Sequence, residues 1–251
     1  MTCAVFFLAA CRRETILPTI DAQTGEAKLQ MKNTHEDRIR KLAAEITSTA
    51  STPMEAAIHI HRWVRDEIAF GIPGKFYDMT ASEVLDVKIG FCNTKTTLFS
   101  ALLSACGIAT RLRMVDLSAQ VLQGLFDPGT PFVDHAITEV FIAGQWHCVD
   151  SYVVDLALAD QARVRLAASG AELGYGIHRS GSSDWNGRTD SLIQAFDGRY
   201  INRQHGYFDD IADFYARTPH ARNRRTFATG LFVRLGAKSI NRTIDRVRRG
   251  V

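Results

Sequence analysis

The stretch KIGFCNTKTTLFSALLSACGI, residues 88–108, has a cysteine at each end of one predicted helix. Apolar side chains recur along it at helical spacing: Leu98, Phe99, Leu102, Leu103 and Cys106. Gly107 stands where a C-cap glycine belongs, so the pattern predicts a buried helix over residues 92–106. Cys106 lies on the apolar stripe and is expected to be an inert packing residue. Cys92 opens the helix, where unpaired N–H groups and the positive end of the helix dipole stabilise a thiolate.

The segments around this helix predict further helices and a strand. Periodic apolar residues predict helices over residues 35–50 and 53–69, with Pro53 in the first turn of the second. Thr80 and Glu83 form a capping-box pattern that begins a short helix. Alternating side chains over residues 108–115 predict a half-buried strand.

Residues 134–150, DHAITEVFIAGQWHCVD, contain two alternating runs and predict a β-hairpin with Ala143-Gly144 as its turn. In that register Ile137 pairs with Asp150. Asp150 then lies on the same face as His135, one diagonal step away, with roughly 7 to 8 Å between the backbone positions of the two residues. A turn longer or shorter by one residue would put the two side chains on opposite faces. The turn therefore decides whether this imidazole and this carboxylate can meet.

Cys92, His135 and Asp150 together supply the parts of a thiol nucleophile. Such a cysteine needs a stabilised thiolate, a base that handles the leaving group's proton, and a group that orients the base. His135 is the candidate base and Asp150 the candidate orienting group. Lys95, one turn after Cys92, adds positive charge. Taken singly, Cys92 and His135 would more often be packing and structural residues.

These segments resemble the core of the transglutaminase-like superfamily of papain-type thiol enzymes, over roughly residues 35–155, and the CNTK form resembles a bacterial branch. Three blocks carry the resemblance: Gly90-Phe91-Cys92 with the helix and Arg-bearing strand that follow, His135-Ala136 through Glu139-Val140, and Gly144-Gln145-Trp146 through Val149-Asp150. The lead-in helices HRWVRDEIAF and ASEVL also fit the family. The matching spacing of the blocks favours the catalytic interpretation over packing.

The resemblance implies an α+β, papain-like fold in which N-terminal helices pack on an antiparallel sheet that includes 108–115, 135–142 and 146–152. It implies Cys92, His135 and Asp150 as catalytic residues, with no cofactor. Two positions depart from the family pattern. Ile137 replaces a Trp, which is expected to alter the substrate cleft, and Ala143 replaces the Asn or Asp of the turn, at little cost because Gly144 remains.

No metal site is expected. Nothing resembles an acidic calcium loop. His59 and His61 are two residues apart on a helix, a spacing that does not face one ligand. His147 points to the other sheet face from Asp150, so it cannot complete a zinc site there. Cys148 shares the face of Asp150 and is expected to be a packing residue.

The expected chemistry is attack of Cys92 on an amide or acyl carbon of a peptide or protein, through a thioester. Resolution by water would make the protein a peptidase or amidase, which is the favoured interpretation; an amine acceptor would make it a transglutaminase. A non-catalytic binding module on the same fold is the third alternative. The backbone N–H of Cys92 can supply one oxyanion donor. Tyr77 and Trp63 are candidates for the second, and the loop 116–133 is expected to line the cleft.

Composition limits the partners and the compartment. The chain has 251 residues with 30 basic and 27 acidic side chains, a formal charge of +3 that makes no general case for nucleic acid. Five cysteines without paired spacing argue against a disulfide framework and for a reducing compartment. We therefore expect no nucleic-acid partner.

The termini are expected to lie outside the catalytic core, which we place at residues 35–160. Residues 1–34 are expected to be a leader or arm. They contain Leu8-Ala9-Ala10-Cys11, which resembles a lipobox, but no Lys or Arg precedes it. A cytoplasmic protein is favoured over a lipoprotein anchored at Cys11. Residues 161–251 form a C-terminal extension in which a helix is predicted from Phe208 to Arg217. The extension ends in a basic amphipathic helix, which is more often docked on its own domain than bound to a membrane.

Overall fold

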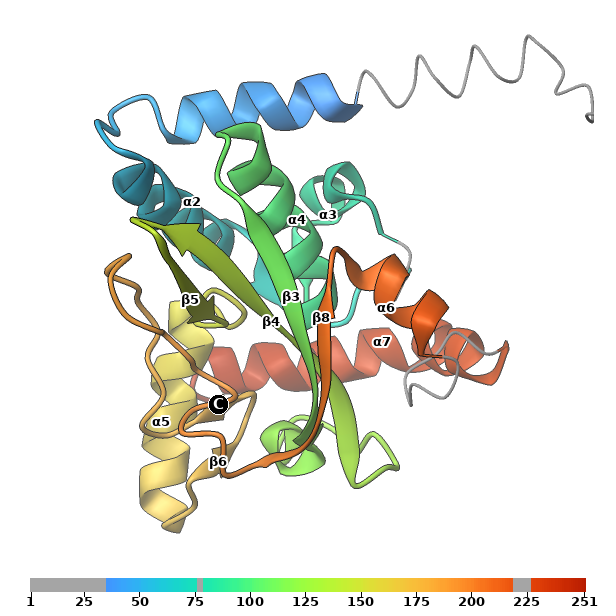
Figure 1. Ribbon diagram of the computed structural model, residues 1–251. Coiled ribbons are helices and arrows are strands. Elements are labelled where there is room, and N and C mark those ends of the chain that lie inside the picture. The colour runs from blue at the N-terminus through green and yellow to red at the C-terminus, as the bar shows by residue number, and fades with distance from the viewer. Residues whose placement is uncertain (1–34, 76–78, 219–226) are drawn as a thin grey trace, which may run out of the picture. The chain divides into compact units, whose positions relative to one another are not determined.

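A computed structural model describes residues 35–75, 79–218 and 227–251. Residues 37–251 form one compact unit. Figure 1 shows how the helices and strands of this unit follow one another. The expectations about Cys11 and Tyr77 lie outside the described residues. In the part of the chain that is described, no helix is both long and apolar enough to span a membrane.

Helices α2 (Pro53–Glu67), α3 (Ala81–Val87) and α4 (Cys92–Ala105) begin where the sequence predicts. Pro53 follows the N-cap residue Thr52, whose side chain accepts a hydrogen bond from the N–H of Glu55. Thr80 and Glu83 form the predicted capping box of α3. Short parallel strands β1 (Ala69–Phe70) and β2 (Ile89–Gly90) precede α3 and α4. The start of α4 at residue 92 places the cysteine in its first turn.

The main sheet has four antiparallel strands in the order β5-β4-β3-β8. Their bounds are Thr110–Ser118 for β3, Phe132–Ile142 for β4, Gln145–Val149 for β5 and Ile201–Phe208 for β8. A 3₁₀ helix, η1 (Ala119–Leu122), follows β3. The predicted α+β arrangement, with N-terminal helices packed on an antiparallel sheet, is confirmed.

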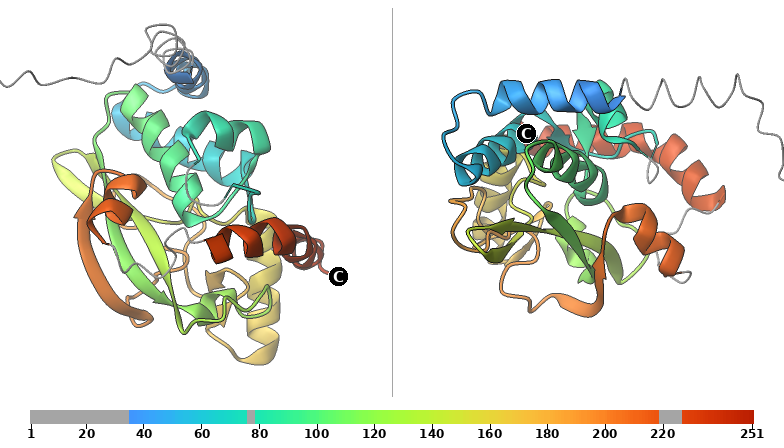
Figure 2. Two further views of the ribbon diagram at one scale, coloured as in Figure 1. Left: turned by 90° about the vertical axis from the view of Figure 1, so that its right-hand side faces the viewer. Right: turned by 45° about the horizontal axis from the view of Figure 1, so that its top comes forward.

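The two faces of this sheet have different coverings. Val140, Ile142 and Val149 join the main core with α2 and α4, and Figure 2 shows these helices stacked on one side of the strands. On the opposite face, Val115 and Ile137 are among the residues that pack with the later segment that carries Leu173 and Ala195. The C-terminal part of the chain therefore covers the face that His135 and Asp150 are predicted to share.

Residues after 155 supply the remaining elements: α5 (Leu156–Ser169), β6 (Leu173–Gly174), β7 (Ile177–His178), α6 (Ile211–Arg217) and α7 (Phe227–Arg248). The apolar stripe of the basic tail, Ile240, Ile244 and Val247, is buried in the main core. Arg248 of α7 donates to the carboxylate of Asp155 and to the carbonyl of Phe70. The helical tail is therefore docked on its own unit.

The helix predicted from Phe208 to Arg217 is present as α6 and ends at Arg217. It begins at Ile211 because Phe208 is the last residue of β8. Asp210 is the N-cap of α6 and accepts from the N–H of Asp213. Strand β8 has an irregular pairing register with β3 and mostly polar residues, so no clear period-2 pattern marks it in the sequence.

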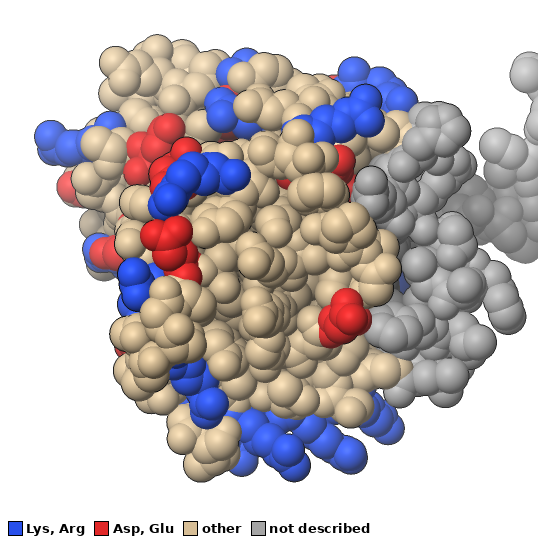
Figure 3. Space-filling model, turned by 90° about the horizontal axis from the view of Figure 1, so that it is seen from below, with Lys and Arg blue, Asp and Glu red and all other residues tan. Residues whose placement is uncertain are grey.

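Charges on the face drawn in Figure 3 lie towards its edges, and neutral residues occupy much of its middle. Lys and Arg side chains gather along one edge of that face, with Asp and Glu mixed among basic groups along another.

Candidate active site

Cys92 is the first residue of α4 and is partly buried. The chain reaches it through Gly90, where an added Cβ would lie 2.7 Å from Oγ1 of Thr94 and 2.9 Å from Cγ of Lys95. A residue with a side chain would push the first turn of α4 away from β2. The sulfur of Cys92 lies 3.9 Å from the backbone carbonyl oxygen of Asp134, the residue before His135. Residues 42 positions apart are thus brought together.

His135 and Asp150 meet as the hairpin register predicts. Nε2 of His135 lies 2.9 Å from Oδ2 of Asp150, and both side chains are almost fully buried. Burial lowers the pKa of His135, but hydrogen bonds with Asp150 and with Cys92 outweigh it and raise the pKa from 6.5 to about 9. The imidazole is therefore charged at neutral pH. Because Nε2 binds Asp150, Nδ1 is the ring nitrogen left for Cys92.

The hairpin turn explains why these residues meet. Ile142 pairs with Gln145, and pairing continues in step to Thr138 and Val149. Ala143 and Gly144 both have positive φ, 52° and 82°, as a two-residue type I′ turn requires. The predicted register is therefore confirmed.

Asp150 is held by a cradle of backbone N–H groups that the sequence did not reveal. The N–H of Ala195 donates to Oδ2 at 3.0 Å, the N–H of Gln194 lies 3.3 Å from the same oxygen, and the N–H of Ile193 donates to Oδ1. A carboxylate that accepts several backbone N–H bonds is held in one orientation. No side-chain pattern marks such donors, because every residue except proline carries one.

Lys95 is fully buried and points to the end of α2. Its Nζ donates to the carbonyl oxygen of Ile68 at 2.5 Å and lies 3.4 Å from that of Arg65. Burial lowers the pKa of Lys95 from 10.5 to about 7. Lys95 was predicted to add positive charge beside Cys92; its ammonium group instead caps the C-terminal carbonyls of α2, so its direct role is to join two helices.

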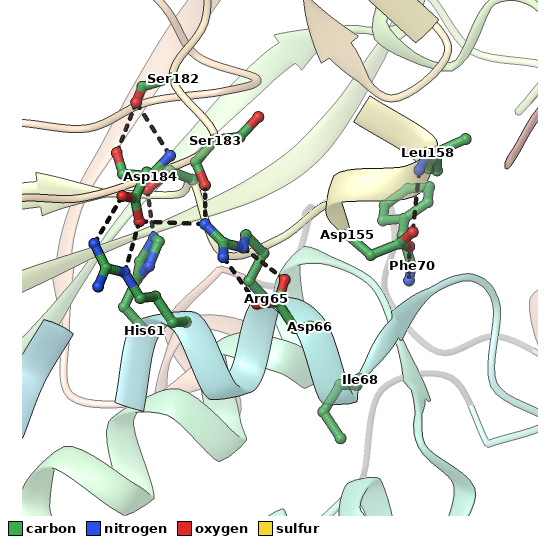
Figure 4. Close-up of polar contacts among 12 residues, drawn as sticks. His61, Arg65, Asp66, Ile68, Phe70, Asp155, Leu158, Ser182, Ser183 and Asp184 are labelled. Atoms are coloured by element: carbon green, nitrogen blue, oxygen red, sulfur yellow. Dashed lines mark hydrogen bonds and ion pairs between the residues drawn. The ribbon is translucent and has the colours of Figure 1, made fainter. Parts of the chain in front are cut away.

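A buried His–Ser pair lies next to Asp150. Nε2 of His61, on α2, lies 2.7 Å from Oγ of Ser151, and neither side chain is exposed. Burial lowers the pKa of His61 to about 3, so the ring is neutral. Figure 4 shows His61 beside the ion-pair network in which Arg65 binds Asp66 and Asp184. The network joins α2 to the segment after β7.

A chain of hydrogen bonds leads from Cys92 to helix α6. The sulfur of Cys92 lies 3.4 Å from Oδ1 of Asn93, whose Nδ2 donates to the hydroxyl of Tyr215 at 3.1 Å. The Tyr215 hydroxyl in turn lies 3.5 Å from Oδ2 of Asp134. Asn93 is 1% exposed. Neither Asn93 nor Tyr215 was singled out from the sequence, although Asn93 follows the cysteine directly.

The other predicted site residues are distributed as follows. Trp63 is partly buried against the main core. Cys106 packs partly buried against the same core. Cys148 is buried, and burial raises its pKa from 9.0 to about 12, so it is a packing thiol. Ile137 is 1% exposed, so the departure from Trp falls in a packed position and not on an open cleft wall.

One group among the described residues could hold a metal ion. Ligand atoms of Asp116, Asp134 and His205 all lie within 4.8 Å of one another. Asp116 lies on β3, Asp134 on the neighbouring β4, and His205 on β8 at the other side of β3. Nε2 of His205 already lies 2.8 Å from Oδ1 of Asp116. The sequence interpretation expected no metal and did not single out these residues, because only the pairing of β3 with both neighbours brings them together.

An open depression of about 620 Å³ lies in the loop that the sequence marked as a cleft wall. Its lining runs from Ser118 to Pro131 and includes Phe126. The other lining residues include the polar side chains of Gln120, Gln123 and Asp127.

Comparison with known proteins shows what this core is similar to. Residues 40–151 match the family model described as the transglutaminase-like superfamily. No curated protein matches the sequence. Among solved structures, the chain is similar to a candidate cysteine protease from Cytophaga hutchinsonii, with 16% sequence identity and a TM-score of 0.44, over 71% of this chain and 44% of that one. The chain thus spans less than half of that structure's length.

Proposed function

Residues 40–151 of this chain match the family model of the transglutaminase-like superfamily, and from this premise we propose that the protein is a thiol hydrolase of peptide or protein amides. Cys92 is the proposed nucleophile, His135 the acid and base, and Asp150 the group that orients His135. The observation that carries the proposal is the buried His135–Asp150 pair, 2.9 Å long, beside the Cys92 sulfur. A charged imidazole there favours a thiolate partner.

The proposed reaction has two steps. The Cys92 thiolate attacks the amide carbonyl carbon, and the charged His135 gives its proton to the leaving amine, which leaves a thioester on Cys92. Neutral His135 then takes a proton from water, the water oxygen attacks the thioester, and the carboxylic acid product leaves as the thiolate returns. Asp150, fixed by three backbone N–H groups, keeps Nε2 engaged so that Nδ1 faces the sulfur.

The oxyanion that forms in both steps needs hydrogen-bond donors. The N–H of Cys92 belongs to the first turn of α4, where backbone N–H groups have no acceptor within the helix, so it is the first proposed donor. Water is the proposed acceptor because it reaches the thioester without a second binding site. An amine that reached the thioester first would give a transferase.

Thiol reactivity tests the proposed pair. Cys92 is expected to react with iodoacetamide at pH 6 to 7 at least roughly tenfold faster than Cys106, whereas an ordinary thiol is mostly protonated there. His135→Ala should remove this advantage, because it removes the charge that stabilises the thiolate. The measurement is peptide mass spectrometry at timed intervals, with Cys106 as the internal reference. Equal rates for Cys92 and Cys106 would favour a non-catalytic module.

Product analysis tests the acceptor. The full chain is incubated with a library of peptide amides, with and without a primary amine, and Cys92→Ala serves as the control. Free acids and ammonia or amines are expected from the wild-type chain alone. A product that contains the added amine in place of the free acid would replace the hydrolase proposal by a transferase.

A further inference from the structure

The immediate surroundings of the Cys92 sulfur are dominated by oxygen acceptors on one side. Oδ1 of Asn93 lies 3.4 Å away and the carbonyl oxygen of Asp134 lies 3.9 Å away. An S–H group can donate to either oxygen, but a thiolate is repelled by both. On the other side His135 favours the thiolate. The state of the nucleophile therefore depends on which of these two influences is stronger.

The orientation of Asn93 is set by Tyr215 of α6. The hydrogen bonds run in one direction: the Cys92 thiol donates to Oδ1 of Asn93, Nδ2 of Asn93 donates to the Tyr215 oxygen, and the Tyr215 hydroxyl donates to Asp134. A hydroxyl has one proton. Because that proton is directed to the Asp134 carboxylate, Tyr215 offers Asn93 only lone pairs, which hold its NH₂ group towards Tyr215 and its oxygen towards the sulfur.

We propose that Asn93 and Tyr215 form a latch that stabilises Cys92 as a thiol, and that the latch opens when the Asn93 amide turns over. This inference rests on the proposed function, for which it supplies a control. Rotation of the amide by half a turn exchanges two groups of nearly equal size. It places an N–H donor against the sulfur, where it stabilises the thiolate. Oδ1 then faces Tyr215, whose hydroxyl turns from Asp134 to donate to it.

Burial makes the latch specific. Asn93 is 1% exposed, so water cannot easily replace its partners, and the amide is restricted to the two orientations that Tyr215 can satisfy. The Tyr215 ring is positioned by packing against Phe214, at a centroid distance of 5.0 Å. Phe214 is itself fully buried. Helix α6, in the part of the chain beyond the family match, therefore determines the hydrogen bonding of the nucleophile.

Two substitutions with opposite expected effects test the latch. Tyr215→Phe removes the group that holds the amide in place, so alkylation of Cys92 by iodoacetamide at pH 6 should become roughly two- to tenfold faster, the worth of one hydrogen bond. Asn93→Asp presents a charged acceptor that cannot become a donor, so alkylation should become at least about tenfold slower. Tyr207→Phe, which alters a half-exposed ring on β8, is the matched control and should leave the rate unchanged.

The pH dependence of the alkylation rate distinguishes the latch from a change in how easily iodoacetamide reaches the Cys92 sulfur. The titratable groups around the sulfur are His135 and Asp134 of β4, Asp150 and Tyr152 after β5, and Tyr215. An ordinary free thiol is mostly ionised at about pH 9.5, one unit above its pKa. The increase in alkylation rate caused by Tyr215→Phe should disappear at this pH. A gain of the same size at both pH values would overturn the proposal, since it would show only easier entry of the reagent.

Other outcomes are equally decisive. Slower or unchanged alkylation of Tyr215→Phe at pH 6, or wild-type rates for Asn93→Asp, would overturn the latch. Loss of folding would change the alkylation rate of both variants in the same direction, so opposite signs cannot come from general damage. His135→Ala separates this inference from the proposed function. If His135→Ala slows alkylation and Tyr215→Phe does not speed it, the latch alone is wrong; if His135→Ala has no effect, the proposed function is wrong.

Discussion

At the residue scale, three buried bases show how surroundings decide charge. His135 has a carboxylate and a thiol as partners, and its pKa rises to about 9. His61 has only a serine hydroxyl, and burial lowers its pKa to about 3. Lys95 has two helix carbonyls, and burial lowers its pKa to about 7. Burial opposes charge in all three, and only His135 has anionic partners close enough to reverse it.

His61 should make the protein sensitive to acid. Its pKa is near 6.5 in the unfolded chain and about 3 in the folded one, so the stability that a neutral ring contributes is complete above pH 6.5 and is lost as the pH falls towards 3. The loss should reach about 3 kcal/mol near pH 4.5. In His61→Gln, the glutamine side chain can still bind Ser151, but it cannot take up a proton. Urea unfolding at several pH values should show a flatter profile for this variant.

His135 does not interfere with this test of His61. The His135 contribution has the opposite sign: it is complete below pH 6.5 and is lost as the pH rises through about 9, so it does not affect the acid range. Parallel profiles for wild type and His61→Gln below pH 6.5 would show that another group controls acid unfolding.

At the element scale, the β4–β5 turn controls the site. The positive φ values of Ala143 and Gly144 make a two-residue turn, and in a strand the side-chain period is two, so one added residue reverses the faces of β5 relative to β4. Ala143 adopts this conformation although it has a Cβ, which costs roughly 1 kcal/mol relative to glycine or asparagine. The continuous pairing of β4 with β5, which includes the ring contact of Phe141 with Trp146, holds Ala143 in this conformation.

An insertion of one glycine after Gly144 should abolish activity while most of the fold survives. Asp150 would turn away from His135, and the 2.9 Å contact between them would be lost. The measurements are turnover and the far-ultraviolet circular dichroism spectrum. A glycine inserted after Gly170, an exposed turn with open space around it, is the control. Turnover retained by the Gly144 insertion would exclude Asp150 as the orienting group.

At the scale of the whole molecule, the site depends on residues beyond the family match. The cradle of Asp150 comes from residues 193–195, the fourth strand from residues 201–208, and Tyr215 from α6. Helix α7 is joined to the rest of the unit by Arg248, which donates hydrogen bonds to the Asp155 carboxylate. Burial alone would raise the pKa of Asp155, but these hydrogen bonds outweigh it and lower the pKa. The C-terminal segment is therefore part of the structure that supports the candidate site.

Arg248→Gln should destabilise the whole unit by roughly 2 to 4 kcal/mol, because it leaves Asp155 charged and mostly buried without its cation. Asp155 would keep the N–H donors of Phe70 and Leu158, which limits the loss. The measurement is urea unfolding at neutral pH. Arg246→Gln, at an exposed position of the same helix, should change stability by less than about 0.5 kcal/mol. Equal effects of the two substitutions would show that the Arg248–Asp155 pair contributes nothing.

The sequence by itself determined the features that depend on short-range spacing. The helix that begins at Cys92 follows from apolar periodicity, and the meeting of His135 with Asp150 follows from a two-residue turn, because covalent geometry links spacing to direction within one element or one hairpin. Only the tertiary structure decided where Lys95 points, which N–H groups hold Asp150, and that Tyr215 reaches Asn93. Those contacts join segments 27 to 122 residues apart, and they depend on packing and on backbone groups that all sequences share.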